Sequence, residues 1–327
     1  MQTSPSYRTN RDLFSNYYLE EYLPESEVWD QVDDEALQRA YDEIEELYEK
    51  EKDTAPKRNE SQLENKFIRP MFRKLGIPFE VEESVERNAR RPDYGFFESE
   101  TAARNAFTRR EEGGDFYEDA VAVADAKRWG RPLDTRGEHE RDFENPSYQI
   151  HVYLQETPAR WAVLTDGQKW RLYYGPMRHR LDSYYEIDLP TVLEEGDLED
   201  FKYFYLFFRH ETFLEDASGD CFLYDVYDES NLFSQELGGD LQENIYDAIK
   251  VLSEGFLEYS DNDLSEETLV EGSLLPDEYE DFERARLDLV HDSALIYLYR
   301  LIFVLYAESE SRELLETDNA IYENSYS

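Results

Sequence analysis

Three side chains with the chemistry of a metal-dependent hydrolase lie at the ends of short apolar segments. Asp125 and Lys127 close the apolar stretch 120–124, and Asp93 opens the segment Tyr94–Phe97. Residues two apart on a strand project from the same face, so Asp125 and Lys127 are expected to point the same way. Carboxylates bind Mg²⁺ through oxygen, and a neighbouring lysine can orient or activate the attacking water. The spacing favours Mg²⁺-dependent cleavage of phosphodiester bonds.

An acidic chain also produces acid-x-Lys by chance, and the alternative is a strand that ends in a solvated turn. The preceding segment adds weight to the hydrolytic interpretation. Residues 59–75 carry apolar side chains at helical spacing, with Gly76 as a stop signal. Glu60 and Glu64 lie one turn apart on this helix. An acidic helix followed by strands that carry Asp93 and Asp125 is the order expected of a PD-(D/E)xK nuclease core.

The chain resembles the N-terminal part of type IIG restriction–modification enzymes, including the related type IIL group. The matching stretches are 13–24, 59–76, 91–97, 124–134, 145–150, 164–173, 201–208 and 299–309. The more specific ones are Lys127–Asp134, which reads KRWGRPLD, and Asn145–Gln149, which reads NPSYQ. In such enzymes this region is the endonuclease domain plus a helical connector, and a methyltransferase and a specificity domain follow.

The resemblance implies catalytic roles for Asp93, Asp125 and Lys127. It also implies an acid on the helix, for which Glu64 is preferred and Glu60 is the alternative. Mg²⁺ would be held by Asp93, Asp125 and Glu64. The third acid of the motif is aspartate here, whereas glutamate is common, and this shorter arm shifts the metal slightly.

Gln149 is a further candidate catalytic residue. Asn145 is expected to cap a helix with Pro146 in its first turn, which places Gln149 and Tyr153 one turn apart. This Gln-x-x-x-Tyr pattern resembles an accessory motif that lines the site in several nucleases of the superfamily. The alternative is an ordinary amphipathic helix with an interfacial tyrosine.

Composition places the chain in a reducing, salty compartment. Cys221 is the single cysteine, so no disulfide can form within the chain and a cytoplasmic location is expected. There is no apolar signal region at the start. The run 294–307 is interrupted by Arg300 and is shorter than a membrane span of about 20 residues, so no membrane partner is expected.

The net charge of −43 and the 9 lysines against 25 arginines indicate a haloarchaeal-type composition. Folding and activity are expected only at high ionic strength, because salt screens the repulsion between carboxylates. An acidic protein that mimics DNA is the alternative. Residues 87–136 carry ten basic and ten acidic groups, so the whole excess of negative charge lies outside the window that holds the candidate site. That neutral window favours a nuclease over a mimic, since phosphates must reach the site.

The sequence predicts an α/β protein with a PD-(D/E)xK restriction-endonuclease-like core, an N-terminal helical extension and a C-terminal helical connector. The expected domains are residues 1–58, 59–190 and 191–327, the last ending before any methyltransferase motif. A hairpin is expected around Asp166-Gly167, and 184–189 is expected to be an edge strand. The expected partners are double-stranded DNA and methyltransferase and specificity domains or subunits. A nuclease fold that has lost activity and serves as a structural or binding module is also compatible with these patterns.

Overall fold

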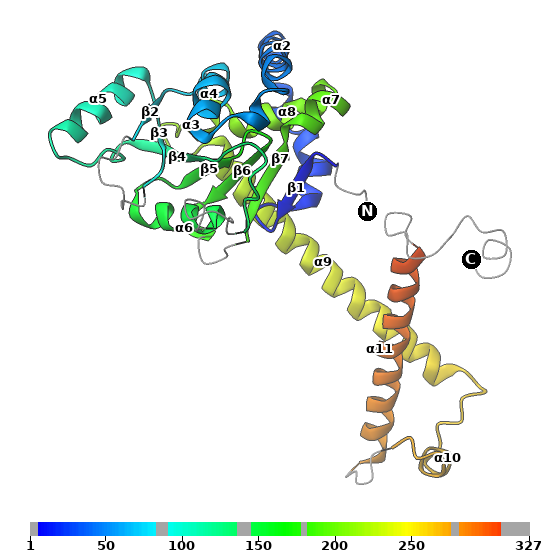
Figure 1. Ribbon diagram of the computed structural model, residues 1–327. Coiled ribbons are helices and arrows are strands. Elements are labelled where there is room, and N and C mark those ends of the chain that lie inside the picture. Colours follow the sequence, from blue (N-terminus) through cyan, green and yellow to red (C-terminus); the bar gives the residue numbers. More distant parts are fainter. Residues whose placement is uncertain (1–5, 83–90, 136–144, 178–181, 276–280, 309–327) are drawn as a thin grey trace. The chain divides into compact units, whose positions relative to one another are not determined.

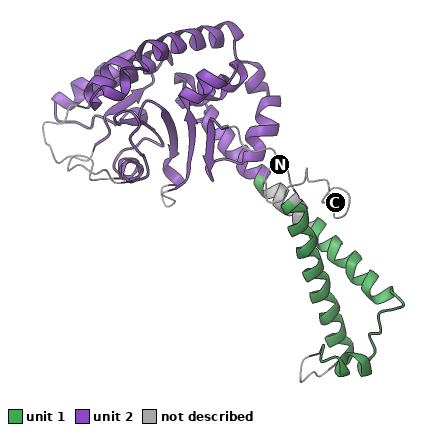
Figure 2. Cartoon of the chain, turned by 45° about the vertical axis from the view of Figure 1, so that its right-hand side comes forward, with its two compact units in different colours: residues 1–3, 234–327 green, residues 4–233 purple. Residues whose placement is uncertain are grey.

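The computed structural model describes residues 6–82, 91–135, 145–177, 182–275 and 281–308. Among these residues the chain divides into two compact units, 4–233 and 234–327 with 1–3 (Figure 2). The unit 4–233 contains the predicted N-terminal extension, the predicted nuclease segment and the start of the predicted connector. The three-part division by sequence remains a prediction.

Seven described strands form one mixed sheet in the order β1-β7-β6-β5-β4-β3-β2 (Figure 1). The strands are β1 (Arg8–Arg11), β2 (Phe79–Val81), β3 (Tyr94–Phe97), β4 (Ala120–Ala126), β5 (Trp161–Thr165), β6 (Lys169–Tyr174) and β7 (Tyr184–Asp188). β4 and β5 run parallel, and the other neighbouring pairs run antiparallel. The predicted α/β class is confirmed.

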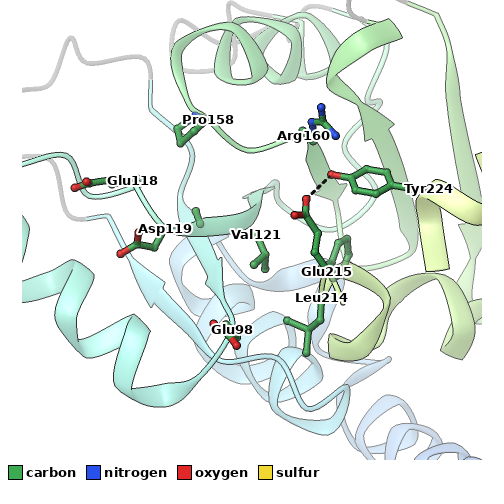
Figure 3. A pocket seen from close by; sticks show the side chains of 11 residues that line it. Glu98, Glu118, Asp119, Val121, Pro158, Arg160, Leu214, Glu215 and Tyr224 are labelled. Carbon is green, nitrogen blue, oxygen red and sulfur yellow. Dashed lines mark hydrogen bonds between the residues drawn. The ribbon is translucent and has the colours of Figure 1, made fainter. Parts of the chain in front are cut away.

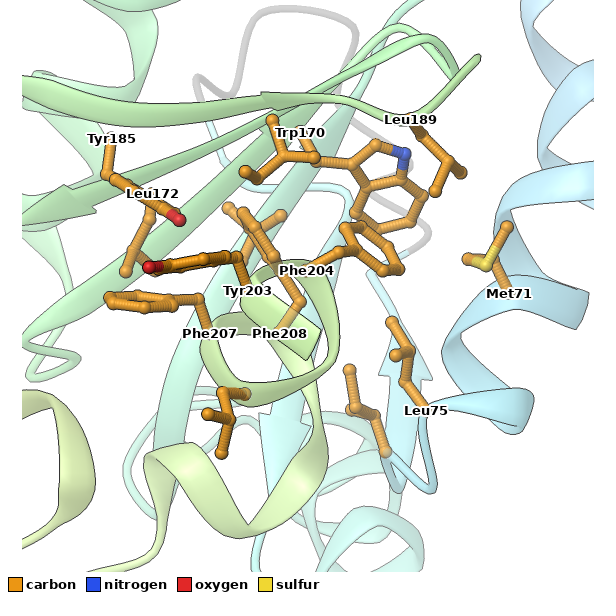
Figure 4. Close-up of a cluster of buried hydrophobic side chains, with 14 of the residues drawn as sticks. Met71, Leu75, Trp170, Leu172, Tyr185, Leu189, Tyr203, Phe204, Phe207 and Phe208 are labelled. Carbon is orange, nitrogen blue, oxygen red and sulfur yellow. The ribbon is translucent and has the colours of Figure 1, made fainter. Parts of the chain in front are cut away.

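Helices cover both faces of the sheet. The helices of this unit are α1 (Glu27–Asp30), α2 (Asp34–Glu51), α3 (Glu60–Leu63), α4 (Arg69–Lys74), α5 (Glu100–Glu111), α6 (Pro146–Glu156), α7 (Leu189–Glu195) and α8 (Leu198–Phe208), followed by the start of α9 (Phe222–Glu258). One core cluster joins α2, α3, α4 and α8 to the sheet, with Phe204, Phe207 and Phe208 against Trp170 and Tyr185 (Figure 4). The aromatic run 201–208 therefore packs a core. A second cluster holds α5 and α6 against the other face.

Glu60–Lys74 is one continuous helical segment, hereafter the site helix, formed by α3, the π-helical turn η4 (Glu64–Ile68) and α4. Asn59 begins it with a capping box that includes Gln62. Gly76 follows its end with φ +72°, a conformation that glycine adopts without steric cost. The helix was predicted from the sequence, whereas the π-helical turn was not.

Two expectations about the edge of the sheet were wrong. The N-terminal extension is not wholly helical, because Arg8–Arg11 pairs with β7 as an antiparallel strand. Consequently β7 is an interior strand and β1 takes the edge. The predicted hairpin is present between β5 and β6, with Gly167 at φ +90° in its turn.

The unit 234–327 contains the end of α9, α10 (Glu266–Glu271) and α11 (Phe282–Glu308). α11 agrees with the long helix that the sequence predicts to begin near Asp281. By length and composition alone, Phe282–Ala307 would also suit a membrane span, a criterion that core helices of soluble proteins meet as well.

Candidate active site

The carboxyl groups of Asp93 and Asp125 lie opposite each other between β3 and β4. Tyr94 pairs with Ala124 in this antiparallel ladder, and extending the register by one residue beyond β3 would set Asp93 against Asp125, with which it interacts electrostatically. Directly opposed Cβ atoms are about 5 Å apart. Asp93 Oδ2 accepts a hydrogen bond of 2.9 Å from the backbone N–H of Ala126. The two acids therefore meet at one end of the sheet.

Asp125 is only 1% exposed and sits on the face of β4 that Val123 shares, opposite to Ala124 and Ala126. Burial raises the pKa of the Asp125 carboxyl well above its usual range, and the Asp93 carboxylate raises this pKa further. Lys127 opposes the rise. Asp125 Oδ2 forms an ion pair with the ammonium of Lys127. Asp125 is thus a buried acid beside a like charge.

Lys127 follows β4 directly, and its backbone N–H donates to the carbonyl of Thr165 at 2.8 Å. This bond continues the parallel pairing with β5 and fixes the backbone from which the side chain leaves. Desolvation works to lower the pKa of Lys127, but the charges of Asp125, Asp93 and Glu60 outweigh it and raise the pKa. The ammonium group therefore stays protonated at neutral pH, among three carboxylates.

The two acids of the site helix have different surroundings. Glu64 accepts hydrogen bonds from the Tyr94 hydroxyl and, at 3.4 Å, from Arg69 Nη2. Glu60 accepts from the backbone of Arg128 and interacts electrostatically with Lys127. Desolvation raises the pKa of both glutamates, and the charge of Asp93 adds to the rise. Both predicted alternatives therefore face the site, Glu64 with its Oε2 already engaged and Glu60 nearer to Lys127.

The remaining sequence candidates take more peripheral positions. Gln149 is half-buried on α6, and its neighbours Ile150 and Tyr153 pack on the same sheet face as Asp125. A catalytic role for Gln149 stays a prediction. Trp129 packs edge-on against Phe67 of the site helix, with ring centroids 5.5 Å apart, and so fastens the end of the strand.

A second charged cluster lies on the same face of the sheet, two strands away. The pairing places Leu164 beside Asp125, Arg171 beside Leu164 and Glu186 beside Arg171. Arg171, 3% exposed, binds Asp134 in a bidentate pair at 2.6 and 2.9 Å. Its Nε donates to Glu186, to which Lys169 is also paired at 3.2 Å. Burial works to lower the pKa of Arg171, but its hydrogen bonds and these acids raise it overall.

Several of these contacts were missed in the sequence. Arg171 and Glu186 each interrupt an otherwise apolar strand, and that interruption was the available signal. Tyr94, which ties Glu64 to the sheet, had no such signal because an aromatic residue in a strand is common.

A pocket lies at the opposite end of β4. This pocket of about 490 Å³ is lined by Glu98, Asp119, Arg160 and Tyr224 among others, and Tyr224 donates to Glu215 at 3.1 Å (Figure 3). Its lining includes neither Asp93 nor Asp125. In the described part of the chain, no group of three His, Cys, Asp or Glu side chains forms a ready-made metal cage.

Comparison of the chain with models of protein families, with curated proteins and with solved structures gives no match.

Proposed function

We propose that this chain is a Mg²⁺-dependent endonuclease module with a PD-(D/E)xK core that hydrolyses phosphodiester bonds in double-stranded DNA. One observation carries the proposal. Asp93, directly before β3, interacts electrostatically with Asp125 of β4, and Lys127 pairs with Asp125 and interacts with Asp93. A purely structural strand end would have no reason to bury Asp125 beside a second carboxylate, because the repulsion costs stability.

The donor set fits Mg²⁺. This ion is usually held by one or two carboxylates and keeps several waters, which leaves room for phosphate oxygens. Asp93 and Asp125 supply such a pair, with the ammonium of Lys127 beside Asp125 Oδ2. Absence of a three-residue cage is compatible with this mode of binding. When bound, Mg²⁺ would polarise the phosphate and make water a better nucleophile.

The residues of the chain would then divide the remaining work. Lys127, held protonated by its acidic neighbours, cannot accept a proton from water at neutral pH. Its ammonium instead orients the water and stabilises negative charge on the phosphate as that charge develops. Tyr94 and Arg69 hold Glu64 in place beside Asp93. The Ala126 N–H fixes the rotamer of Asp93.

The test is cleavage of plasmid DNA by the purified chain with and without Mg²⁺, at a salt concentration where the chain is folded. We expect nicking with Mg²⁺, none with EDTA and none for Asp125→Asn. A folded chain that neither binds nor nicks DNA would support the inactive structural module instead. Inhibition of another DNA-binding protein in the absence of DNA binding would support the acidic mimic.

The wider setting follows from the sequence resemblance. We propose a part of a type IIG-like restriction–modification system in the cytoplasm, with methyltransferase and specificity domains or subunits as partners. Since reading of bases requires an element fitted into a groove, we expect this chain alone to cleave without sequence preference. Selection from randomised duplexes should return no consensus, and a clear motif would contradict this expectation.

A further inference from the structure

The site helix has an outer surface that differs from the rest of this acidic chain. Glu60–Lys74 contains four basic residues and two acidic ones, a net charge of +2, whereas the whole chain carries −43. Its two acids, Glu60 and Glu64, interact with Asp93 at the site. The exposed positions that remain on this helix are polar, uncharged or basic.

The neighbouring helix α2 provides the contrast. Asp34–Glu51 has eight acidic and two basic residues, a net charge of −6. The two helices pack against the same core, and an ion pair of 3.4 Å between Lys74 and Glu43 links them. Solvent exposure alone would favour acids on both helices in a chain of this composition. The exposed surface of the site helix, which adjoins the candidate site, is therefore not acidic, although most of the chain is.

Three cations form a stripe along the site helix. Arg69 and Arg73 lie one α-helical turn apart on one side of the helix, and Lys66 precedes them in the π-helical turn. Arg69 is the cation of this stripe that contacts the candidate site, where it donates to the Tyr94 hydroxyl at 3.2 Å. Lys66 and Arg73 are exposed, and neither forms an ion pair with a carboxylate of the described residues. Arg73 lies 5.3 Å from the centroid of the Phe79 ring, which limits its range of orientations.

We propose that Lys66 and Arg73 form a binding track for the phosphate backbone of double-stranded DNA on its way to the Asp93–Asp125 pair. The separation of seven residues between them corresponds to about 10 Å of helix. Duplex DNA carries one charge per about 3.4 Å on each strand, so the track covers roughly three phosphates of one strand. The inference rests on the proposed function, because it names the surface by which the substrate of that site is held.

The experiment compares two double variants with the same change of charge. Lys66→Glu/Arg73→Glu reverses the track, and Arg39→Glu/Lys50→Glu reverses two exposed cations of α2. Binding of a fluorescently labelled random-sequence duplex is measured by anisotropy in EDTA, so that hydrolysis does not intervene. The salt series covers about 0.3 to 1 M KCl, where charges on the protein are well screened.

We expect the track variant to bind about tenfold or more weakly, and the slope of log K against log salt to fall by about 2 in magnitude. The α2 variant should behave as wild type in both respects. At subsaturating DNA with Mg²⁺, cleavage by the track variant should slow in line with its weaker binding. If the charge reversal impairs folding, the neutral pair Lys66→Ala/Arg73→Ala replaces it, with Arg39→Ala/Lys50→Ala as its control.

The outcomes separate the two proposals. Equal weakening in both double variants, or in neither, overturns the track and leaves the nuclease proposal untouched. Selective weakening in a chain that never cleaves DNA supports the track and overturns the nuclease. Absence of duplex binding by the folded wild-type chain overturns the track outright.

Discussion

Two charged clusters share one face of the same sheet and balance their charges in opposite ways. In the first, Asp93 and Asp125 place two carboxylates together against a single ammonium, that of Lys127, and the pKa of Asp125 is raised by burial and by its like-charged neighbour. In the second, Arg171 forms hydrogen bonds with two acids, Asp134 and Glu186. Partial burial works to raise the pKa of Asp134, but the hydrogen bonds and charge of Arg171 lower it overall.

Leu164 lies between the two clusters in the row that runs across the strands. Removing charged groups from water destabilises both clusters, yet only in the second do bidentate hydrogen bonds offset this loss. Fully paired buried charges are compatible with a purely structural role. A buried acid that keeps a like charge beside it is retained against stability, which is the pattern expected of a functional site.

The largest expected effect separates the lysines of the two clusters. Lys127→Ala should lower the rate of DNA cleavage by about 10²–10⁴-fold, because charge stabilisation and orientation of water are lost. Lys169→Ala is the matched control: Lys169 pairs with Glu186 in the second cluster, and its removal should leave the rate unchanged. Single-turnover kinetics on plasmid DNA measure both. Equal losses in the two variants would mean that the first cluster has no special role in the chemistry.

Next in size is the expected loss of stability in the second cluster. Arg171→Met should lower the free energy of unfolding by about 3–5 kcal/mol, since Glu186 is left buried without its partner. The double variant Arg171→Met/Glu186→Gln removes both charges and should recover a large part of this loss. Urea denaturation of the three proteins gives the comparison. A loss for the double variant as large as for the single one would show that the pairing of charges is not what matters.

Asp166, in the β5–β6 turn near the second cluster, differs from Asp134 because its pKa is raised. We therefore expect stability to depend on pH through this residue. Burial, opposed by hydrogen bonds from the backbone of Lys169 and Gln168, raises the pKa of Asp166 to about 6. The folded state thus disfavours the charged form. Its contribution to stability is fully present below the unfolded pKa of about 3.9 and is lost as pH rises to about 6, with an upper limit of about 3 kcal/mol.

Asp166→Asn keeps an oxygen acceptor for the backbone N–H groups of Gln168 and Lys169 and removes the ionisation. The variant should match wild type near pH 4 and be more stable than wild type above about pH 6. Chemical denaturation at several pH values measures the difference. A difference that does not change with pH would mean that Asp166 is not the titrating group.

The sequence predicted those parts of the fold that local patterns specify. Helical spacing gave the site helix with its stop at Gly76, and the Asp166-Gly167 turn gave the hairpin β5–β6. β1 was missed because Arg8–Arg11 is short and polar, and it becomes a strand only by pairing with β7. Such long-range pairing has no local signal. The same pairing made β7 an interior strand instead of an edge.

For the candidate site, alternation along a strand was enough to relate Asp125 to Lys127. The position of Asp93 opposite Asp125 depends on the register between β3 and β4, which a single sequence does not encode locally. The choice between Glu60 and Glu64 could not be made either. That choice depends on Tyr94 and Arg69, whose side chains donate hydrogen bonds to Glu64 in the folded chain.

The smallest expected effect is the sharpest test of the comparison, because it predicts opposite signs for the same chemical change. Asp125→Asn removes a like charge from beside Asp93 and supplies an amide that can donate to it. The ion pair with Lys127 is lost, but Asp93 and Glu60 still balance that ammonium, so stability should rise by about 1–2 kcal/mol. Asp134→Asn breaks the bidentate pair with Arg171, and because the Asp134 side chain is 51% exposed the loss should be about 1 kcal/mol. Thermal or urea unfolding at neutral pH, without divalent metal, measures both.

If Asp125→Asn destabilises the fold as much as Asp134→Asn does, both acids have a structural role. Stabilisation by Asp125→Asn together with loss of cleavage would identify the first cluster as one that the chain keeps for function at the expense of stability.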